Sequence, residues 1–265
     1  MYTGGTAMKE GQRRIYLLDE LRGFAIICMV FHHMFYDIGF VLHYDIGYKI
    51  FNYLCVFQPF FWAIFIITSG VCSRLSRNTV RRGIIVFAAG LAVTLVTAVI
   101  MPAIGITGAE IYFGVLSCLG LSMIITGIFM PLINKLGKKG SIAGMAVSAA
   151  LFLITYSVSE GSLFFGLVEL PQALYSNNIF AFLGFHNGRF FSADYFPLIP
   201  WLFMFLFGAF LGKWAKDGAL PKAFYKSRVK FFQKAGKNSL WIYLLHQPAL
   251  YAVMYLISFI QLLSM

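Results

Sequence analysis

Charged residues are scarce in this sequence. Only 12% of the 265 residues are Asp, Glu, Lys or Arg, whereas 60% are hydrophobic, and the mean hydropathy is +0.78. This balance excludes an ordinary soluble protein and is typical of an integral membrane protein. Acidic residues are the scarcest, at ten against 21 basic ones, which gives a formal net charge of +11.

Cysteine is also rare, and its placement argues against a metal site. All four cysteines lie within or beside apolar runs: Cys28, Cys55, Cys72 and Cys118. None of them forms a CxxC pair or a cluster with histidine. The tandem His32 and His33 do not complete a site either, because adjacent side chains on a helix diverge. The sequence therefore predicts no bound metal.

Long apolar runs recur along the chain. Seven stretches approach the roughly 20 residues that a membrane-crossing helix needs. They lie near residues 15–36, 50–72, 83–101, 111–133, 141–158, 195–212 and 239–262. The sequence thus predicts an all-α, polytopic integral membrane helix bundle of about seven transmembrane helices. Residues 15–265 are expected to form this single transmembrane domain, after a cytoplasmic N-terminal leader at residues 1–14 that we exclude from the fold.

Basic residues gather in alternate connections between the expected spans. They precede the first span and follow the second, the fourth and the sixth, where a run of eight extends from Lys213 to Lys237. The other connections are acidic or neutral. The positive-inside rule then places the N-terminus in the cytoplasm and the C-terminus outside. The positive charge is mostly a topology signal with some attraction to anionic lipid, so no nucleic-acid partner is expected.

One further stretch, residues 163–185, is apolar enough to be an eighth span. Glu169, Pro171 and the polar residues 176–178 interrupt it. Irregular backbone at membrane depth survives only where protein or water covers it. We therefore expect an interfacial or re-entrant segment on the outer face. The alternative, an eighth crossing, would move the basic run from Lys213 to Lys237 outside.

The first span contains charged residues that are costly in hydrocarbon, in the sequence LDELRGFAIICMVFHHMFYDIGF. Eleven residues make almost three helical turns, so Arg22 and His33 lie about 20° apart on one stripe, roughly 16 Å from each other along the axis. Asp37, one turn beyond His33, can reach its imidazole and raise its basicity. Asp19 can pair with Arg22 in the same way. The spacing predicts two polar couples on one line.

These residues also have ordinary structural explanations. Arg22 lies about 10 Å from the inner boundary, where a long side chain can snorkel to the headgroups. Single histidines such as His43 and His186 are commonly structural groups with a satisfied hydrogen bond. For His33 this explanation is weaker, because Arg22 and Asp37 share its face.

The last span adds a second polar signal, AGKNSLWIYLLHQPAL, at residues 235–250. Asn238 or Ser239 can cap the helix, which puts His246 about 10 Å from the cytoplasmic boundary. Pro248 frees a carbonyl one turn earlier. His246 is therefore expected either to bond that carbonyl or a neighbour, or to act at a ligand.

Four patches carry a resemblance to a known family. They are LDELRGFAIICMVFHH, FGVLSCLGLS, DYFPLIPWLFMFLFGAFLG and GKNSLWIYLLHQP. Together, in order between Arg14 and about Leu262, they resemble the bacterial relatives of heparan-alpha-glucosaminide N-acetyltransferase, within the wider group of transmembrane acyltransferases. Arg22 and His33 resemble the Arg/Lys–His motif of membrane acyltransferases, which is tied to acyl-CoA use and transfer.

The resemblance implies an acyl-CoA-dependent acyltransferase of the bacterial cytoplasmic membrane. It would move an acyl group, expected to be acetyl, from cytoplasmic acyl-CoA to a hydroxyl or amine of an extracytoplasmic sugar or glycan. The expected catalytic residues are His33, Asp37 and His43. His43 is an alternative to His33 as the active histidine, because the lysosomal relatives have a proposed active histidine in the loop after the first span. The expected donor-binding residues are Arg22, Asp19, His246 and Asn238. The expected acceptor-binding residues are Asp194, Tyr195, Trp201 and Arg189.

Three questions stay open from the sequence. A transporter or channel for a small anion or a proton, lined by Arg22, His33 and His246, is the alternative function, although no internal repeat supports it. A structural or assembly subunit is a third reading, in which Arg22→Ala and His33→Ala are silent. The family's lysosomal members are longer, so completion of the acceptor site by a homo-oligomer is a further expectation.

Overall fold

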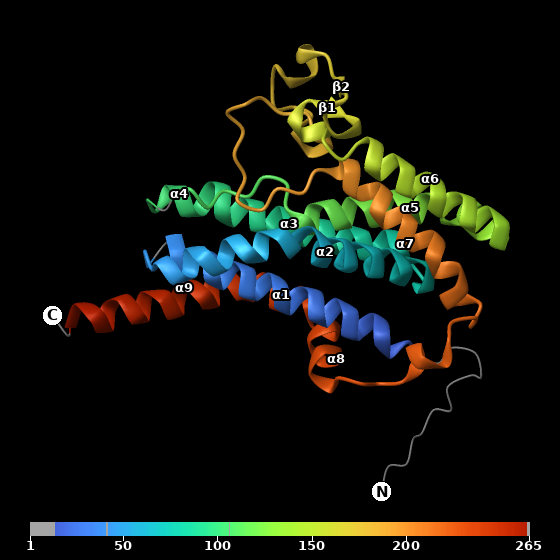
Figure 1. Ribbon diagram of the computed structural model, residues 1–265, viewed down its shortest axis with the longest axis horizontal. Coiled ribbons are helices and arrows are strands. Elements are labelled where there is room, and N and C mark those ends of the chain that lie inside the picture. Colours follow the sequence, from blue (N-terminus) through green and yellow to red (C-terminus); the bar gives the residue numbers. More distant parts are fainter. Residues whose placement is uncertain (1–13, 41, 106, 264–265) are drawn as a thin grey trace, which may run out of the picture. The chain divides into compact units, whose positions relative to one another are not determined.

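The computed structural model describes residues 14–40, 42–105 and 107–263 (Figure 1). The expected leader at residues 1–14 therefore lies outside the described residues, apart from Arg14. Seven helices in the described part are long and apolar enough to cross a membrane. They confirm the predicted all-α polytopic bundle, whereas the direction in which it crosses the membrane stays a prediction.

The spans follow the predicted apolar runs, with ends that differ by a few residues. They are α1 (Tyr16–Phe40), α2 (Asp45–Leu75), α3 (Thr79–Leu95), α5 (Val115–Lys135), α6 (Lys138–Ile154), α7 (Leu198–Lys216) and α9 (Ser239–Leu263). The third span continues from α3 through one π-helical turn, Val96–Ile100, into α4 (Met101–Ala103). A shorter helix, α8 (Lys230–Lys237), precedes α9.

The apolar stretch at residues 163–185 is irregular. It contains the strand β2 (Val168–Glu169), which pairs antiparallel with β1 (Ser162–Leu163), and short 3₁₀ turns at Phe164–Gly166, Gln172–Tyr175 and Ala181–Leu183. Within the described residues no helix of spanning length lies in this stretch. The prediction that the stretch does not form an eighth span is confirmed.

The chain divides into two compact units, which we describe separately. The terminal unit joins the residues up to Phe65 with those from Trp214 onward, so it contains α1, the first part of α2, α8 and α9. The central unit is Ile66–Lys213, which contains the rest of α2 together with α3 to α7 and the irregular stretch.

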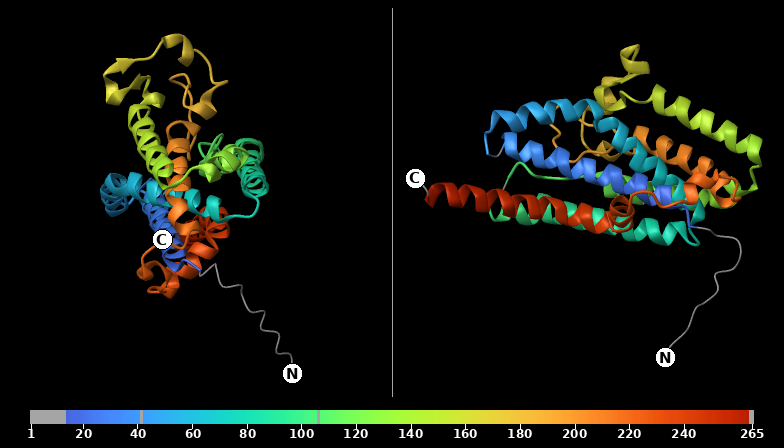
Figure 2. Two further views of the ribbon diagram at one scale, coloured as in Figure 1. Left: turned by 90° about the vertical axis from the view of Figure 1, so that its right-hand side faces the viewer. Right: turned by 60° about the horizontal axis from the view of Figure 1, so that its bottom comes forward.

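In the terminal unit, α1 packs against α8 and α9 (Figures 1 and 2). Gly23 and Gly236 meet where α1 crosses α8. A Cβ atom on Gly23 would overlap the carbonyl of Phe232, and one on Gly236 would overlap the carbonyl of Asp19. Only glycine allows these two backbones to approach so closely. Farther along, α9 runs parallel to α1. His33 of α1 contacts His246 of α9, and the later Asp37 contacts the later Gln247.

Glu20 fixes the start of α8. Its carboxylate is buried, and Oε1 accepts hydrogen bonds from the backbone N–H groups of Arg228 (2.7 Å) and Val229 (3.1 Å). Val229 is the N-cap residue of α8 and has no side-chain cap of its own. A carboxylate at this position satisfies free N–H groups and complements the helix dipole. Glu20 therefore ties α8 to α1, although the two helices are far apart in the sequence.

In the central unit, small residues bring α3 and α5 together. A Cβ atom on Gly120 would overlap the backbone of Phe87, and Gly83 lies against the backbone at Gly120 and Ile124. Such contacts between small residues are how helices associate in a membrane, where burial of apolar surface supplies little driving force. The same device joins α2 to α7, since Gly208 lies against the Ile67 carbonyl.

Arg74 is buried inside the central unit, although sequence reasoning treated it as a loop cation. Its guanidinium donates to the carbonyl of Ala209 on α7 at 3.3 Å and to that of Ile133 on α5 at 3.0 Å. Arginine is suited to this role because its planar group offers five N–H donors. Arg74 thus ties the ends of three helices together.

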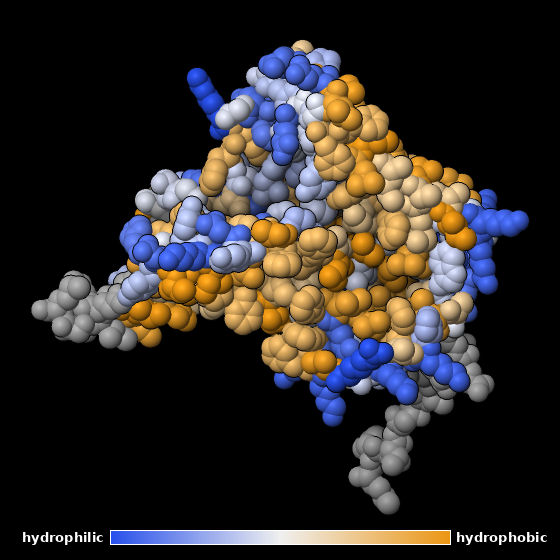
Figure 3. Space-filling view, viewed as in Figure 1, coloured by the Kyte–Doolittle hydropathy of each residue, from blue (hydrophilic) through white to orange (hydrophobic). Residues whose placement is uncertain are grey.

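Apolar side chains cover much of the visible surface of the helices (Figure 3). Large examples are highly exposed, such as Tyr53 at 75% and Tyr255 at 77%. Water-soluble proteins rarely expose contiguous apolar surface on this scale, whereas lipid tails cover it at no cost. The surface therefore agrees with the membrane-spanning lengths of the helices.

Candidate functional site

The polar line predicted along α1 is present in the terminal unit. At its first end, Asp19 Oδ2 pairs with Arg14 at 2.8 Å, and Asp19 Oδ1 lies 4.0 Å from Arg22 Nη2. Arg22 Nη1 also donates to the carbonyl of Gly236 at 3.5 Å. The expected Asp19–Arg22 couple is therefore formed, and the close crossing of α1 and α8 places it beside α8.

Three turns farther along α1, the His33 ring meets His246 of α9. The ring centroids are 5.1 Å apart. His246 Nδ1 lies 2.6 Å from the Tyr243 carbonyl, and a carbonyl can only accept, so Nδ1 donates the hydrogen. In the neutral imidazole, Nε2 is then the basic nitrogen. The structure places His246 with His33, about three helical turns from Arg22, and its bond to a nearby carbonyl is one of the two roles expected of it.

Asp37 lies one turn beyond His33 and is fully buried, at 0% exposure. Its two carboxylate oxygens accept from Gln247 Nε2 of α9 at 3.4 and 3.3 Å. The expected bond between Asp37 and the His33 imidazole is not formed among the described residues, because the amide of the neighbouring helix reaches the carboxylate instead. The couple predicted within α1 is thus replaced by two contacts between α1 and α9.

His32 faces away from this line, as the divergence of adjacent helical side chains predicts. Its ring lies 4.7 Å from Phe51 and 6.3 Å from Phe61, centroid to centroid, and both are residues of α2. Its Nε2 is 3.6 Å from the sulfur of Cys55, also on α2. The two adjacent histidines therefore serve two different helix contacts of the terminal unit.

Two other expected residues lie outside these contacts. His43 is exposed in the short connection after α1, with a left-handed backbone (φ 57°). It follows His33 by ten residues, so it lies beyond the end of the helix that carries the line. Asn238 uses its side-chain amide to donate to the Lys234 carbonyl at 2.9 Å, which closes the C-terminus of α8.

The arrangement in the terminal unit can do acid–base chemistry. It brings together a guanidinium, two imidazoles and a buried carboxylate along one pair of parallel helices. Charged and titratable groups at membrane depth are expensive and mark substrate or proton paths far more often than packing positions. Among the described residues, no group of three or more His, Cys, Asp or Glu side chains is placed to hold a metal.

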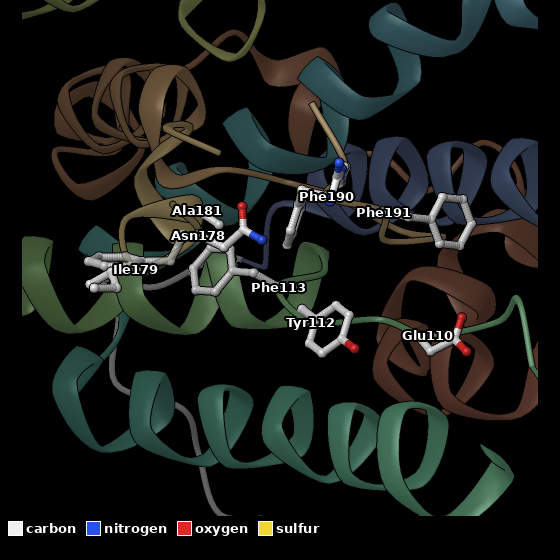
Figure 4. A pocket seen from close by; sticks show the side chains of 10 residues that line it. Glu110, Tyr112, Phe113, Asn178, Ile179, Ala181, Phe190 and Phe191 are labelled. Carbon is white, nitrogen blue, oxygen red and sulfur yellow. The ribbon is translucent and has the colours of Figure 1, made fainter. Parts of the chain in front are cut away.

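A pocket of about 590 Å³ lies in the central unit. Figure 4 shows it between the segment that leads into α5 and the irregular stretch before α7. The rings of Tyr112 and Phe190 face it with centroids 6.0 Å apart, and Glu110, Asn178 and Arg189 supply polar groups. Aromatic faces with a few polar groups are typical of pockets for small polar ligands.

Of the four expected acceptor residues, Arg189 lines this pocket, and the other three act in the packing around it. Asp194 Oδ2 accepts from the Val115 N–H at 3.2 Å and so caps α5. The Tyr195 hydroxyl donates to the Ala181 carbonyl at 2.6 Å. Trp201 is buried against Phe152 and Phe196. These three residues hold the segments that form the pocket.

The environment of Tyr195 alters its acidity. Burial raises the pKa of Tyr195 to about 12, and its side-chain hydrogen bond with Ser159 opposes this rise. Burial also raises the pKa of Tyr175, whose hydroxyl donates to the Val158 carbonyl. Both phenols therefore stay neutral donors that anchor the irregular stretch.

Sequence reasoning assigned no role to Gln247, Glu20 or Cys55. Gln247 did carry a signal, since an apolar span has no need for an amide next to His246. Glu20 gave no local signal, because its partners lie more than 200 positions away in the sequence. Cys55 looked like an ordinary apolar residue until the structure placed it against His32.

Comparison with known proteins gives one match. The family model described as "Heparan-alpha-glucosaminide N-acetyltransferase, catalytic" matches residues 14–248. The matched region covers all seven spans up to the middle of α9, including the whole polar line and the pocket. Neither a curated protein nor a solved structure gives a significant match.

Proposed function

The chain belongs to the heparan-alpha-glucosaminide N-acetyltransferase catalytic family, a family of membrane acetyltransferases, and on that premise we propose the direction and the partners of its reaction. The donor is cytoplasmic acyl-CoA, in the first place acetyl-CoA. The acceptor is a hydroxyl or amine of a sugar or glycan on the extracytoplasmic side. The observation that carries the proposal is the line of ionisable groups from Arg22 to Asp37, which contacts α8 at Arg22 and α9 at His33 and Asp37.

The Arg22 end suits an anionic donor. Arg22 is steadied by Asp19 and by the Gly236 carbonyl, and α8 beside it carries Lys230, Lys234 and Lys237. Phosphates of the CoA nucleotide would bind these cations, while the guanidinium would hold a phosphate or a pantetheine carbonyl. The basic connections support a cytoplasmic location of this end, on the side where acyl-CoA is found.

The His33 end suits the acceptor. His33 would take the proton from the attacking hydroxyl or amine as general base. His246, with its hydrogen fixed on Nδ1, supplies a second basic nitrogen next to that ring. Asp37, held by Gln247, would stabilise positive charge that develops on the imidazoles. His43 is less suited to this role, since it is exposed beyond the end of the helix.

The pocket of the central unit has the chemistry of a sugar-binding surface. Sugar rings present C–H faces that pack on aromatic side chains and hydroxyls that bond carboxylate, amide and guanidinium groups. Tyr112 and Phe190 supply the faces, and Glu110, Asn178 and Arg189 the polar groups (Figure 4). The two segments that form the pocket precede α5 and α7, and the basic residues follow these two helices. The positive-inside rule therefore predicts that the segments lie outside.

The cellular setting follows from the same proposal. The enzyme is a multi-pass protein of the bacterial cytoplasmic membrane, and a homo-oligomer would supply any part of the acceptor site that one chain lacks. Its chemistry uses protein side chains and acyl-CoA as co-substrate.

The direct test uses purified protein in liposomes. Labelled acetyl-CoA is enclosed on the side of the basic connections, and glucosamine is supplied on the other side as the acceptor probe. We expect labelled N-acetylglucosamine to form outside, and His33→Ala to abolish it. Absence of both acetyl-CoA binding by calorimetry and His33-dependent acetyl-CoA hydrolysis would refute the proposal.

A second function is favoured by one observation, the continuity of titratable groups along α1 and α9. Such lines also conduct protons or small anions through membrane proteins. Proton or anion flux through the liposomes that depends on Arg22, His33 and His246, in the absence of any acyl transfer, would identify a transporter. Silent Arg22→Ala and His33→Ala variants in both assays would identify a structural subunit.

A further inference from the structure

A thiol and an imidazole face each other where α1 meets α2. Cys55 Sγ of α2 lies 3.6 Å from His32 Nε2, within hydrogen-bond distance for sulfur. Phe51 and Phe61 of α2 contact the same ring and fix its position. The His32 side chain is buried, and Cys55 is half-buried.

Cys55 differs in its surroundings from Cys28. Cys28 lies on α1 and is also half-buried, but no imidazole lies against its sulfur. A thiol is a strong nucleophile once its proton is removed, and an adjacent base is the usual means of removing it. Cys55 and His32 therefore have the geometry of an activated nucleophile and its base.

The pair also adjoins the proposed acyl-transfer line. The rings of His32 and His33 are 5.8 Å apart, and the His33 ring is 5.1 Å from that of His246. One thiol and three imidazoles thus form a continuous group across α2, α1 and α9 in the terminal unit. An acyl group on the sulfur would lie within one side chain of the base that we assign to the acceptor.

We propose that Cys55 is the first acceptor of the acyl group and His32 its general base, so that transfer proceeds through a thioester on the protein. The inference rests on the proposed acyltransferase function. Cys55 contacts the residue next to His33, so the acyl group already lies at the depth of His33 when the sulfur receives it. The sulfur receives the group from the pantetheine arm and passes it on after CoA has left.

The two half-reactions balance. In the first, the Cys55 sulfur attacks the thioester carbonyl of acyl-CoA as His32 Nε2 takes the thiol proton. The bond between the carbonyl carbon and the CoA sulfur breaks, and the departing sulfur receives the proton. In the second, the acceptor hydroxyl or amine attacks the Cys55 thioester while His33 takes its proton, and the freed Cys55 sulfur is protonated again.

His32 removes the proton during the attack rather than before it. A separated thiolate and imidazolium would be costly in this apolar setting, so the pair rests as a neutral thiol and a neutral imidazole. One thioester replaces another of the same kind, hence the first half-reaction is freely reversible. Reversibility supplies the test.

The experiment uses the whole protein in detergent with acetyl-CoA and isotopically labelled free CoA, without any acceptor. We expect label to enter acetyl-CoA. Cys55→Ala should reduce this exchange at least ~100-fold, as loss of a nucleophile does, and Cys28→Ala should leave it unchanged. Mass spectrometry of the wild-type protein should find an acetyl group on the Cys55 peptide that neutral hydroxylamine removes.

The outcomes separate this inference from the function on which it rests. The thioester intermediate is refuted if the wild-type protein acetylates glucosamine without CoA exchange. It is also refuted if Cys55→Ala acetylates glucosamine at an unchanged rate. Either result leaves the proposed acyltransferase function intact. Absence of acetylation, binding and hydrolysis by the wild-type protein overturns the function itself. Exchange and the Cys55 adduct are measured on the wild-type protein, so a variant that fails to fold does not leave the question undecided.

Discussion

At the scale of single residues, the polar groups of the terminal unit are arranged by contacts between helices. Asp37 is the clearest case, since its spacing from His33 allows a bond within α1 but Gln247 of α9 takes its place. A buried carboxylate needs hydrogen-bond donors, and here the donor that reaches it is the Gln247 amide. The result leaves the His33 ring beside a second imidazole and places the carboxylate one turn away from both.

The Asp37–Gln247 contact predicts coupled effects on acyl transfer. We expect Asp37→Asn to lower kcat about 100-fold, because it removes the negative charge near the imidazoles, and Gln247→Leu about tenfold, because it removes the donor that positions that charge. The double variant should be no slower than Asp37→Asn alone, since the two side chains act through one contact. Leu245→Ala, on the exposed side of α9, serves as the control. Fully additive losses would show that the contact does not matter.

The raised pKa of Tyr195 predicts a loss of stability at alkaline pH. The pKa rises from its ordinary value of 10.0 to about 12 in the fold, so the neutral phenol is favoured there. This contribution is fully present below pH 10 and is lost as pH rises through 12. We expect the thermal midpoint of the wild-type protein to fall toward that of Tyr195→Phe over this range. The exposed Tyr53→Phe should track the wild-type protein at every pH.

At the scale of elements, the crossing of α1 and α8 positions the donor end. Two glycines let the backbones touch, and Glu20 holds the start of α8. Neither feature follows from the apolar pattern of the sequence, which predicts spans but not the partner of each span. The seven spans could be predicted because each needs only local apolarity and length. The glycine crossing could not, because its two halves are more than 200 residues apart.

Gly236→Ala tests this crossing. Alanine is the better helix former by about 1 kcal/mol, so a helix without neighbours would gain stability. Here the added Cβ would overlap the Asp19 carbonyl, and we expect a net loss of about 1–3 kcal/mol with a lower thermal midpoint. Acetyl-CoA affinity should fall as well, because Arg22 loses its contact with the Gly236 carbonyl.

Gly188→Ala is the matched control for that experiment. No atom lies within 4 Å of the position that its Cβ would occupy. It should therefore leave both the thermal midpoint and acetyl-CoA affinity unchanged. A stable Gly236→Ala protein with normal affinity would mean that α8 does not pack on α1 in this way.

At the scale of the whole molecule, the distribution of basic residues predicts the direction in which the chain crosses the membrane. Eight of them lie between Lys213 and Lys237. The same rule predicts that the irregular stretch is extracytoplasmic. The proposed reaction depends on this sidedness, since donor and acceptor come from opposite faces.

Cysteine labelling in intact cells tests the sidedness. Gly137 and Gly188 have open space around them, so each tolerates a small side chain. An impermeant thiol reagent should label Gly188→Cys from outside, and Gly137→Cys only after the membrane is permeabilised, both counted above the wild-type background. The reverse pattern would invert the topology and remove the cytoplasmic donor from Arg22.

The site itself could be predicted only in part. The Arg22–His33 stripe follows from helical geometry, and the structure retains it because both residues lie on one rigid element. Contacts between helices could be found only from the fold: Gln247 with Asp37, Cys55 with His32, and His246 with His33. Nothing in a periodic pattern specifies which residue of one helix will face which residue of another.

The most direct test of the central claim is the steady-state kinetics of Arg22→Ala and His33→Ala with acetyl-CoA and glucosamine. If the line joins a donor end to an acceptor end, Arg22→Ala raises the KM for acetyl-CoA with a smaller change in kcat, and Arg22→Lys recovers part of it. His33→Ala lowers kcat by about 10²–10⁴ at nearly unchanged KM. Wild-type values of both parameters in both variants would contradict the claim.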